Sequence, residues 1–206
     1  FRSESKLFKK FDIKAVFGIH LYPGLPEGIL GLCEGPMMAQ NGEFDITISG
    51  VSAHGAQPHL GIDAMLAQAA LIQGIHTIVS RNINPLDSAV ITVGTIKGGE
   101  ARNIIAQSVS LSGTIRAFNE TVYTMLKKRM HAVIDGCENA YGVTIEAVIR
   151  DYYPPVVNDR KLVQLAKSVY EECEYTEIAP LMISEDFSYY QQVVPGCFVL
   201  LGTKNE

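Results

Sequence analysis

The sequence predicts a mixed α/β fold in which a middle segment is inserted into an α/β body. The middle of the chain switches between strand-like and helix-like hydrophobic spacing in the order β-α-β-β-α-β. The flanks instead carry short, almost wholly apolar runs, Ala15–His20 and Cys197–Leu201, which are typical of strands buried on both faces. We therefore assign 1–43 and 153–206 to the body and 44–152 to the insertion.

The composition is that of a globular protein with a proper core. Of 206 residues, 47% are hydrophobic and 19% charged. The net charge of −5, without a basic run, argues against nucleic acid as a partner. No apolar stretch reaches the roughly 20 residues of a membrane span. The cysteines form no C-x-x-C pair, so we expect free thiols and a cytoplasmic protein; they are Cys33, Cys137, Cys173 and Cys197.

The insertion begins with a strand and a helix. Phe44, Ile46 and Ile48 alternate with polar residues, which is the period of a half-buried strand. A helix is expected from Asp63 to Ser80, with Asp63 in its first turn, where a negative charge complements the helix dipole. Its apolar stripe is predicted to be Ile62, Leu66, Ala69, Ile72, Ile75 and Val79.

Two strands, a helix and a last strand follow. The strands cover 89–96 and 108–118 and are joined by a glycine-rich turn, 97–102. Asn119 can cap a helix that Gly142 ends, and the last strand covers 143–150. Four strands and two helices in this order predict a ferredoxin-like unit, an antiparallel sheet covered on one face by the helices.

The flanks are less regular. We expect a helix to end at Leu7–Phe11, and residues 24–42 to form loops around one short strand, 28–32. Asn158 can cap a third helix, whose stripe would be Leu162, Leu165, Val169 and Cys173. A loop with the acidic pair Glu185-Asp186 leads into a further helix, where an ordinary cap is the simplest role of the pair.

Histidines mark the candidate chemistry. His54 and His59 lie in the loop 50–64, between a strand and a helix, and His20 closes the first buried strand. A histidine can stabilise a developing oxyanion or bind a metal, and ligands gather beyond the carboxyl ends of strands in α/β sheets. From position alone, each of these histidines could equally satisfy backbone groups nearby.

Several segments, taken together, resemble the M20 metallopeptidase and amidohydrolase family, most closely its hippurate hydrolases and N-acyl-amino-acid amidohydrolases. The segments run through nearly the whole chain in order; they are VFGIHLYPGLPEG, PMMA, SAHGAQPHLGIDA, SRNINPLDSAVITV, ARNIIAQ, GTIRAFN and SEDFSYY.

The resemblance implies a catalytic α/β domain that holds two divalent metal ions (Zn, Mn, Co or Ni) and an inserted ferredoxin-like lid that forms a homodimer. It implies that His20 is a metal ligand and that His54 stabilises the oxyanion in the active site of the partner subunit. Asn103 and Arg116 match lid positions that hold the substrate, an N-acyl amino acid. No membrane or nucleic acid partner is implied.

The chain also departs from the family. The other metal ligands, a Cys-x-His segment, a carboxylate pair and a late histidine, have no match in it, so we expect an N- and C-terminally incomplete piece that is inactive alone and does not hold the metals tightly. At 103–107 the family's NVIPD is replaced by NIIAQ. The alternative is a non-catalytic oligomerisation or small-molecule-binding module on the ferredoxin-like scaffold.

Overall fold

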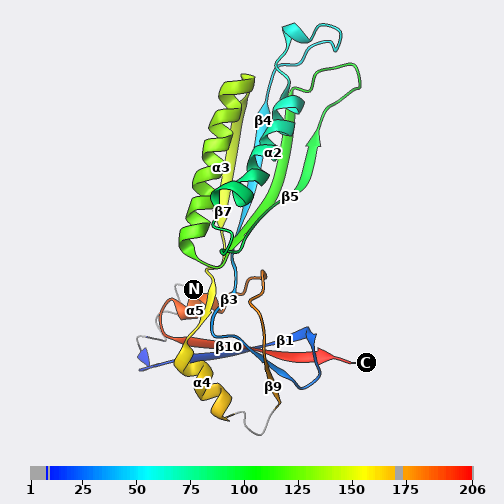
Figure 1. The fold of residues 1–206 in the computed structure, drawn as a ribbon. Coiled ribbons are helices and arrows are strands. Elements are labelled where there is room, and N and C mark those ends of the chain that lie inside the picture. Colours follow the sequence, from blue (N-terminus) through cyan, green and yellow to red (C-terminus); the bar gives the residue numbers. More distant parts are fainter. Residues whose placement is uncertain (1–7, 9, 170–173, 206) are drawn as a thin grey trace. The chain divides into compact units, whose positions relative to one another are not determined.

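The structure, a computed structural model, describes residues 8, 10–169 and 174–205. It is a mixed α/β protein whose described strands form three sheets. The chain divides into two compact units, 1–40 with 153–206 (unit 1) and 41–152 (unit 2). Figure 1 shows their elements coloured along the sequence.

Unit 1 is built on a four-stranded sheet in the order β1-β10-β2-β9. A two-stranded sheet, β3-β8, and the helices α4 and α5 also belong to its described residues. The element bounds are β1 Val16–Pro26, β2 Leu30–Leu32, β3 Gly35–Met38, β8 Val156–Asn158, α4 Arg160–Val169, β9 Tyr175–Glu177, α5 Ser188–Gln191 and β10 Gly196–Lys204.

Strand β10 is the centre of unit 1 because its apolar run is buried on both faces. It pairs in parallel with β1 and antiparallel with β2. Cys197 and Val199 pack with Val163 and Ala166 of α4. Phe198 and Leu200 pack on the other face in a second cluster that includes Phe187. The prediction of a doubly buried strand is therefore correct for β10.

The same prediction is wrong for β1. Its alternate residues Phe17, Ile19 and Leu21 are 51%, 60% and 61% exposed. The cause is position, because β1 is an edge strand and α4 packs through Val163 and Ala166 on β10 and β2. One face of β1, which carries these large apolar side chains, thus stays open among the described residues.

Residues 24–42 contain more strand than the sequence suggests. β1 continues to Pro26, β2 begins at Leu30, and β3 pairs with β8. Of the glycines that suggested loops, Gly24, Gly31 and Gly42 lie within strands, Gly28 lies in the turn between β1 and β2, and Gly35 begins β3. Gly28 and Gly35 have φ values of +81° and +73°, a left-handed conformation that side chains disfavour.

The cap of α4 is Asp159, not Asn158. Asp159 Oδ1 accepts from the N–H groups of Lys161 (2.9 Å) and Leu162 (3.1 Å). The shift by one residue changes the buried stripe to Val163 and Ala166. The predicted stripe is wrong in its centre, since Leu165 and Val169 are 52% and 66% exposed, and Cys173 lies outside the described residues. In the expected helix 7–11, only Phe8 and Lys10 are described as helical.

Unit 2 has the order β-α-β-β-α-β, as the sequence predicts. Its sheet order is β5-β6-β4-β7, and both helices lie on one face of it (Figure 1). The bounds are β4 Gln40–Ser49, the short 3₁₀ helix η1 Pro58–Leu60, α2 Ala64–Asn82, β5 Ala89–Gly98, β6 Ser108–Ala117, α3 Glu120–Tyr141 and β7 Thr144–Asp151.

The core of unit 2 lies between this sheet and its two helices. β4 buries Phe44, Ile46 and Ile48, as predicted. α3 is capped by Asn119, whose Oδ1 accepts from the N–H of Val122 at 2.8 Å, and ends at Gly142 with φ +68°. Both of these helix signals are confirmed.

The predicted stripe of α2 is only partly correct. Ile75 is fully buried, and Ile62, Ile72 and Val79 are partly buried against the core. Leu66 is 58% exposed, and Ala69 is also exposed. The buried set is Ala64, Ala67, Gln68, Leu71, Ile75 and Ile78. α2 is apolar around most of its circumference, so spacing alone does not select one face. Asp63 is the N-cap itself and accepts from the N–H groups of Met65 and Leu66.

Candidate functional site

His20 lies in β1 of unit 1, where its ring is held by the neighbouring backbone. His20 Nδ1 is 2.7 Å from the carbonyl oxygen of Leu21. A carbonyl can only accept, so Nδ1 carries a proton, and in the neutral ring Nε2 then carries the lone pair. This tautomer is the one that binds metals through Nε2.

A carboxylate faces that lone pair. Glu185 Oε2 is 4.0 Å from His20 Nε2. Burial, followed by the hydrogen bond and the charge of neighbouring Asp186, raises the pKa of Glu185 above its usual range, while His20 opposes that rise. Two acceptors facing each other favour a positive charge between them, a proton or a metal ion. His20 could therefore donate Nε2 to a metal ion, with the carboxylate of Glu185 close by.

The sequence did not reveal that Glu185 lies beside His20. The expected helix cap is wrong, because α5 begins after Phe187 without a side-chain cap. Glu185 Oε1 instead accepts from the N–H of Asp186 at 3.1 Å. The sequence signal that could have pointed to Glu185 is the acidic pair just before a short helix. In the structure Oε2 of Glu185 remains available for a ligand.

The described residues do not complete a metal centre by themselves. In 8, 10–169 and 174–205, no group of three or more His, Cys, Asp or Glu side chains could hold a metal ion. A site built from protein ligands needs three or four of them. Within the described residues, His20 therefore has too few partners to hold a metal ion.

His54 lies in unit 2, exposed at the end of the sheet where β4 ends and β6 begins. Its loop is joined to the segment 103–107 by the backbone: His54 bridges Ile104, and the N–H of Gly55 donates to Asn103 O at 2.8 Å. The structure therefore brings two predicted site residues, His54 and Asn103, together. His59 is exposed in η1, and no hydrogen bond of its ring is described.

Two glycines allow this close packing of the loop. A Cβ atom at Gly50 would lie 2.1 Å from the carbonyl oxygen of Ile62, and one at Gly61 would lie 2.8 Å from that of Val51. Both distances are too short for a side chain. Val51 and Ile62 also exchange two backbone hydrogen bonds of 2.9 Å. The glycines thus allow the two sides of the loop to pack closely and to be joined by backbone hydrogen bonds.

Arg116 is not part of this group. It lies in β6, opposite Val90 of β5, and faces the side of the sheet that the helices leave open. From the start of β6 at Ser108 to Arg116 are eight residues, or about 26 Å at the usual rise of a strand. Arg116 and the pair His54–Asn103 thus mark opposite ends of β6.

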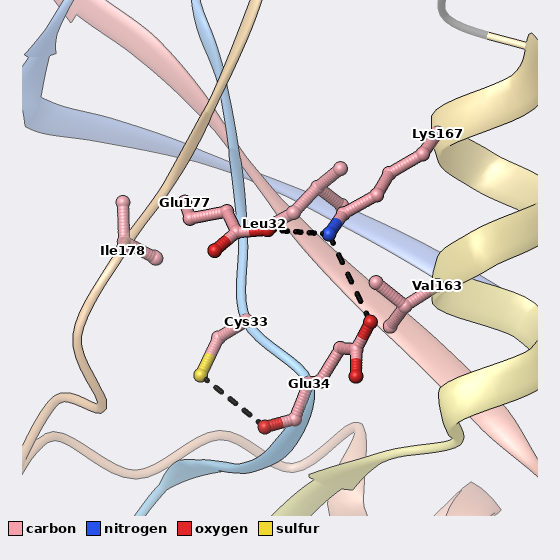
Figure 2. Close-up of a pocket in the computed structure, with 7 residues that line it drawn as sticks. All are labelled: Leu32, Cys33, Glu34, Val163, Lys167, Glu177 and Ile178. Atoms are coloured by element: carbon pink, nitrogen blue, oxygen red, sulfur yellow. Dashed lines mark hydrogen bonds and ion pairs between the residues drawn. The ribbon is translucent and has the colours of Figure 1, made fainter.

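A cavity of about 330 Å³ under α4 is a second candidate site in unit 1 (Figure 2). Lys167 Nζ lies 2.6 Å from Glu177 and 3.8 Å from Glu34, so the charges in it are already paired. Burial and these two carboxylates raise the pKa of the Cys33 thiol, which disfavours a nucleophilic thiolate. The cavity is lined by Leu32, Cys33, Glu34, Val163, Lys167, Glu177 and Ile178.

Three cysteines lie among the described residues. Cys33, Cys137 and Cys197 are buried free thiols. Burial also raises the pKa of Cys197, to about 11. Among the described helices, none combines the length and the apolar character needed to cross a bilayer.

Comparison with known proteins identifies the family. The model of peptidase family M20/M25/M40 matches residues 3–206. The chain belongs to this M20 family.

Its relatives are named as hydrolases and deacetylases. The chain is 40% identical over 203 residues to the IAA-amino acid hydrolase ILR1-like 4 of Arabidopsis thaliana, covering 95% of this chain and 46% of the relative. It is 37% identical over 196 residues to the N-acetyl-L-cysteine deacetylase of Bacillus subtilis, with 94% and 47% covered. The chain thus spans about half the length of these M20 relatives.

A solved M20 structure matches the whole chain. The YxeP protein of Bacillus subtilis, described as a dinuclear metal-binding peptidase, superposes with a TM-score of 0.78 at 27% identity. The match covers 100% of this chain and 52% of that protein. The mixed α/β architecture with several sheets is therefore that of M20 proteins.

Proposed function

We propose that this chain is part of a metal-dependent amidohydrolase that cleaves the amide bond of N-acyl amino acids. The observation that carries the proposal is the family match over nearly the whole chain, with relatives named for the hydrolysis of amino-acid conjugates and N-acetyl amino acids. Hippurate is a suitable first substrate. A cytoplasmic location fits the buried free thiols.

In this proposal, the catalytic domain consists of 1–43 and 153–206, which is unit 1 with the first three residues of unit 2, and 44–152 is the lid and dimerisation domain. His20 binds one of two divalent metal ions through Nε2, and sequence outside this chain supplies the other donors, because the described residues contain no group of three. When bound, such metals lower the pKa of a water and polarise the scissile carbonyl. Whether they are Zn, Mn, Co or Ni is a matter for metal analysis of the complete enzyme.

The lid residues bind the substrate and stabilise the oxyanion that forms from it in the transition state. The guanidinium of Arg116 suits the free carboxylate of an N-acyl amino acid. Asn103 contacts the substrate beside His54, which donates to the oxyanion, an interaction strongest in the transition state. One small substrate cannot span the roughly 26 Å of β6 that separates Arg116 from the other two. We therefore assign Arg116 from one copy and His54 with Asn103 from a second copy to each substrate, which requires a homodimer.

The role of His54 is tested in the complete enzyme. His54→Ala should lower kcat by about 10²- to 10³-fold, the usual loss for an oxyanion donor. Metal content, measured by mass spectrometry of the elements, should stay unchanged. His59→Ala, in the same loop, is the matched control and should keep its activity. A parallel loss of metal in His54→Ala would make His54 a ligand and contradict the proposed role.

The homodimer is tested by mixing two inactive variants. If Arg116 and His54 serve different subunits' sites, a dimer of one Arg116→Ala chain and one His54→Ala chain has one intact site. Random reassembly should then restore about a quarter of the wild-type activity. A mixture with no more activity than its parents would show that both residues act within one chain or that the enzyme is not a dimer.

The alternative, a non-catalytic oligomerisation or small-molecule-binding module, predicts a different result. The full-length protein would then bind no metal pair and hydrolyse no N-acyl amino acid. Its oligomeric state would survive Arg116→Ala and His54→Ala unchanged, which the enzyme proposal also allows. Metal content and hydrolysis of the full-length protein therefore decide between the two.

A further inference from the structure

The loop that carries His54 is exposed but rigidly connected. Besides the bond from Gly55 to Asn103, the N–H of Gly50 donates to Gln107 O at 2.7 Å and that of Ile105 donates to Ala53 O at 2.9 Å. Backbone bonds thus flank His54 on both sides. The backbone therefore holds the Cα atom of His54 in place. A side chain that must contact a reacting atom needs such a fixed backbone position.

Within the loop, His54 opens a tight turn. The N–H of Gln57 donates to the carbonyl oxygen of His54 at 2.8 Å. The same turn points the N–H of Ala56 at the imidazole, 3.1 Å from His54 Nδ1. A backbone N–H can only donate, so Nδ1 must accept and carries no proton.

We infer that the backbone N–H of Ala56 is a positioning group that fixes His54 in the tautomer with its proton on Nε2. The neutral ring then presents Nε2–H as a hydrogen-bond donor. Among the described residues, no group accepts from that atom.

The contrast with His20 shows that the two rings are set differently. His20 Nδ1 faces a carbonyl oxygen and keeps its proton, which leaves a lone pair on Nε2. His54 Nδ1 faces an N–H and has no proton, which leaves a donor on Nε2. A lone pair suits a metal and a donor suits an oxyanion, so each backbone contact prepares the ring for a different task. The use of the donor on an oxyanion depends on the proposed function, whereas the tautomer does not.

Nitrogen NMR tests the tautomer on this chain, without metal or substrate. The imidazole nitrogens of the ¹⁵N-labelled chain are recorded about 1.5 units above the ordinary histidine pKa of about 6.5, and His54 is assigned by the signals lost in His54→Gln. We expect the Nδ1 signal at the position of an unprotonated nitrogen and Nε2 at that of a protonated one. Signals in the reverse positions, or averaged as in a freely exchanging ring, would overturn the inference.

Removing the N–H of Ala56 tests the cause. In Ala56→Pro, or with the amide of residue 56 replaced by an ester if proline disrupts the turn, the His54 signals should move to averaged positions. Ala56→Gly keeps the N–H and should leave them unchanged. If the His54 signals do not move in the ester, Ala56 does not set the tautomer.

Two isosteric variants connect the tautomer to catalysis in the complete enzyme. The amide nitrogen of His54→Gln lies near the place of Nε2, and that of His54→Asn near the place of Nδ1. If Nε2–H is the donor, His54→Gln should retain more kcat than His54→Asn. Equal kcat values together with the expected NMR signals would leave the tautomer standing and refute the oxyanion role, so the two claims fail separately.

Discussion

Asn158 illustrates how a buried amide can be mistaken for a helix cap. Its Nδ2 donates to the carbonyl oxygens of Cys33 and Phe198, both at 2.9 Å, and its Oδ1 accepts from the N–H of Phe198 at 2.7 Å. The side chain therefore ties β8 to β10 and to the chain after β2. In the sequence, an Asn before a helix fits a cap. The groups that this side chain binds in the folded protein are far away in the sequence, so a local pattern does not reveal them.

These contacts predict a large effect of one substitution. Asn158→Ala should lower the free energy of unfolding by about 3 kcal/mol, because it leaves several buried backbone groups without a hydrogen-bond partner. Asp159→Ala, which removes only the α4 cap, should cost about 1 kcal/mol. Urea denaturation of both variants gives the comparison. Equal losses would mean that the buried amide contributes no more than a cap.

An exposed carboxylate gives unit 2 a dependence on acid. The Arg150 hydrogen bond, then that of Ser112, holds the pKa of Asp45 below its usual range. Its contribution to stability is therefore present above the unfolded pKa of about 3.9 and is lost as the pH falls through the lower folded pKa.

We expect Asp45→Asn to be less stable than the wild type at pH 7 and equally stable in strong acid. Urea midpoints measured from pH 7 to pH 2 should converge below about pH 4. Asp87→Asn, at an exposed aspartate without a described side-chain contact, should show no such convergence. A gap between Asp45→Asn and wild type that persists in acid would contradict the assigned cause.

At the scale of elements, the sequence predicts type and order better than faces. Alternation located β4 and β6, and Asn119 with Gly142 bounded α3, because these signals are local. The buried face of α2 was predicted only in part, since a helix that is apolar almost all round gives no unique stripe. The open face of β1 was missed because burial of an edge strand depends on what packs over it, which no local pattern encodes.

That open face predicts self-association of the 206-residue chain. Phe17, Ile19 and Leu21 together expose a row of large apolar side chains, which solvated surfaces rarely carry. Replacing Phe17 and Leu21 by Ser should lower the sedimentation coefficient at high concentration. Val148→Ser, on the exposed face of β7 in unit 2, is the control and should change nothing. A wild-type chain that stays monomeric at these concentrations would contradict the prediction.

At the scale of the whole molecule, the candidate site is only partly encoded in this chain. The resemblance found His20, His54, Asn103 and Arg116, and their assignment to a site remains a prediction. It did not reveal that Glu185 faces His20 or that Arg116 is remote from His54, because both facts depend on how distant strands pair. From sequence position alone, without the resemblance, each of these residues could equally have had a structural role.

The isolated chain should therefore be inactive. One imidazole and one nearby carboxylate do not hold a metal pair, so the purified 206-residue chain should contain no stoichiometric metal after dialysis and should not hydrolyse hippurate. Elemental analysis and a ninhydrin assay of released glycine measure the two. Substantial hydrolysis would show that the residues of this chain suffice for catalysis.

The ends of unit 2 meet. The N–H of Tyr152 donates to the carbonyl oxygen of Asn41 at 3.0 Å, where Gly42 and Asp151 pair across β4 and β7. A gene segment cut at these two codons would encode a closed module with its own apolar interior. It could be exchanged between family members as a cassette, carrying the His54 loop into a foreign catalytic host.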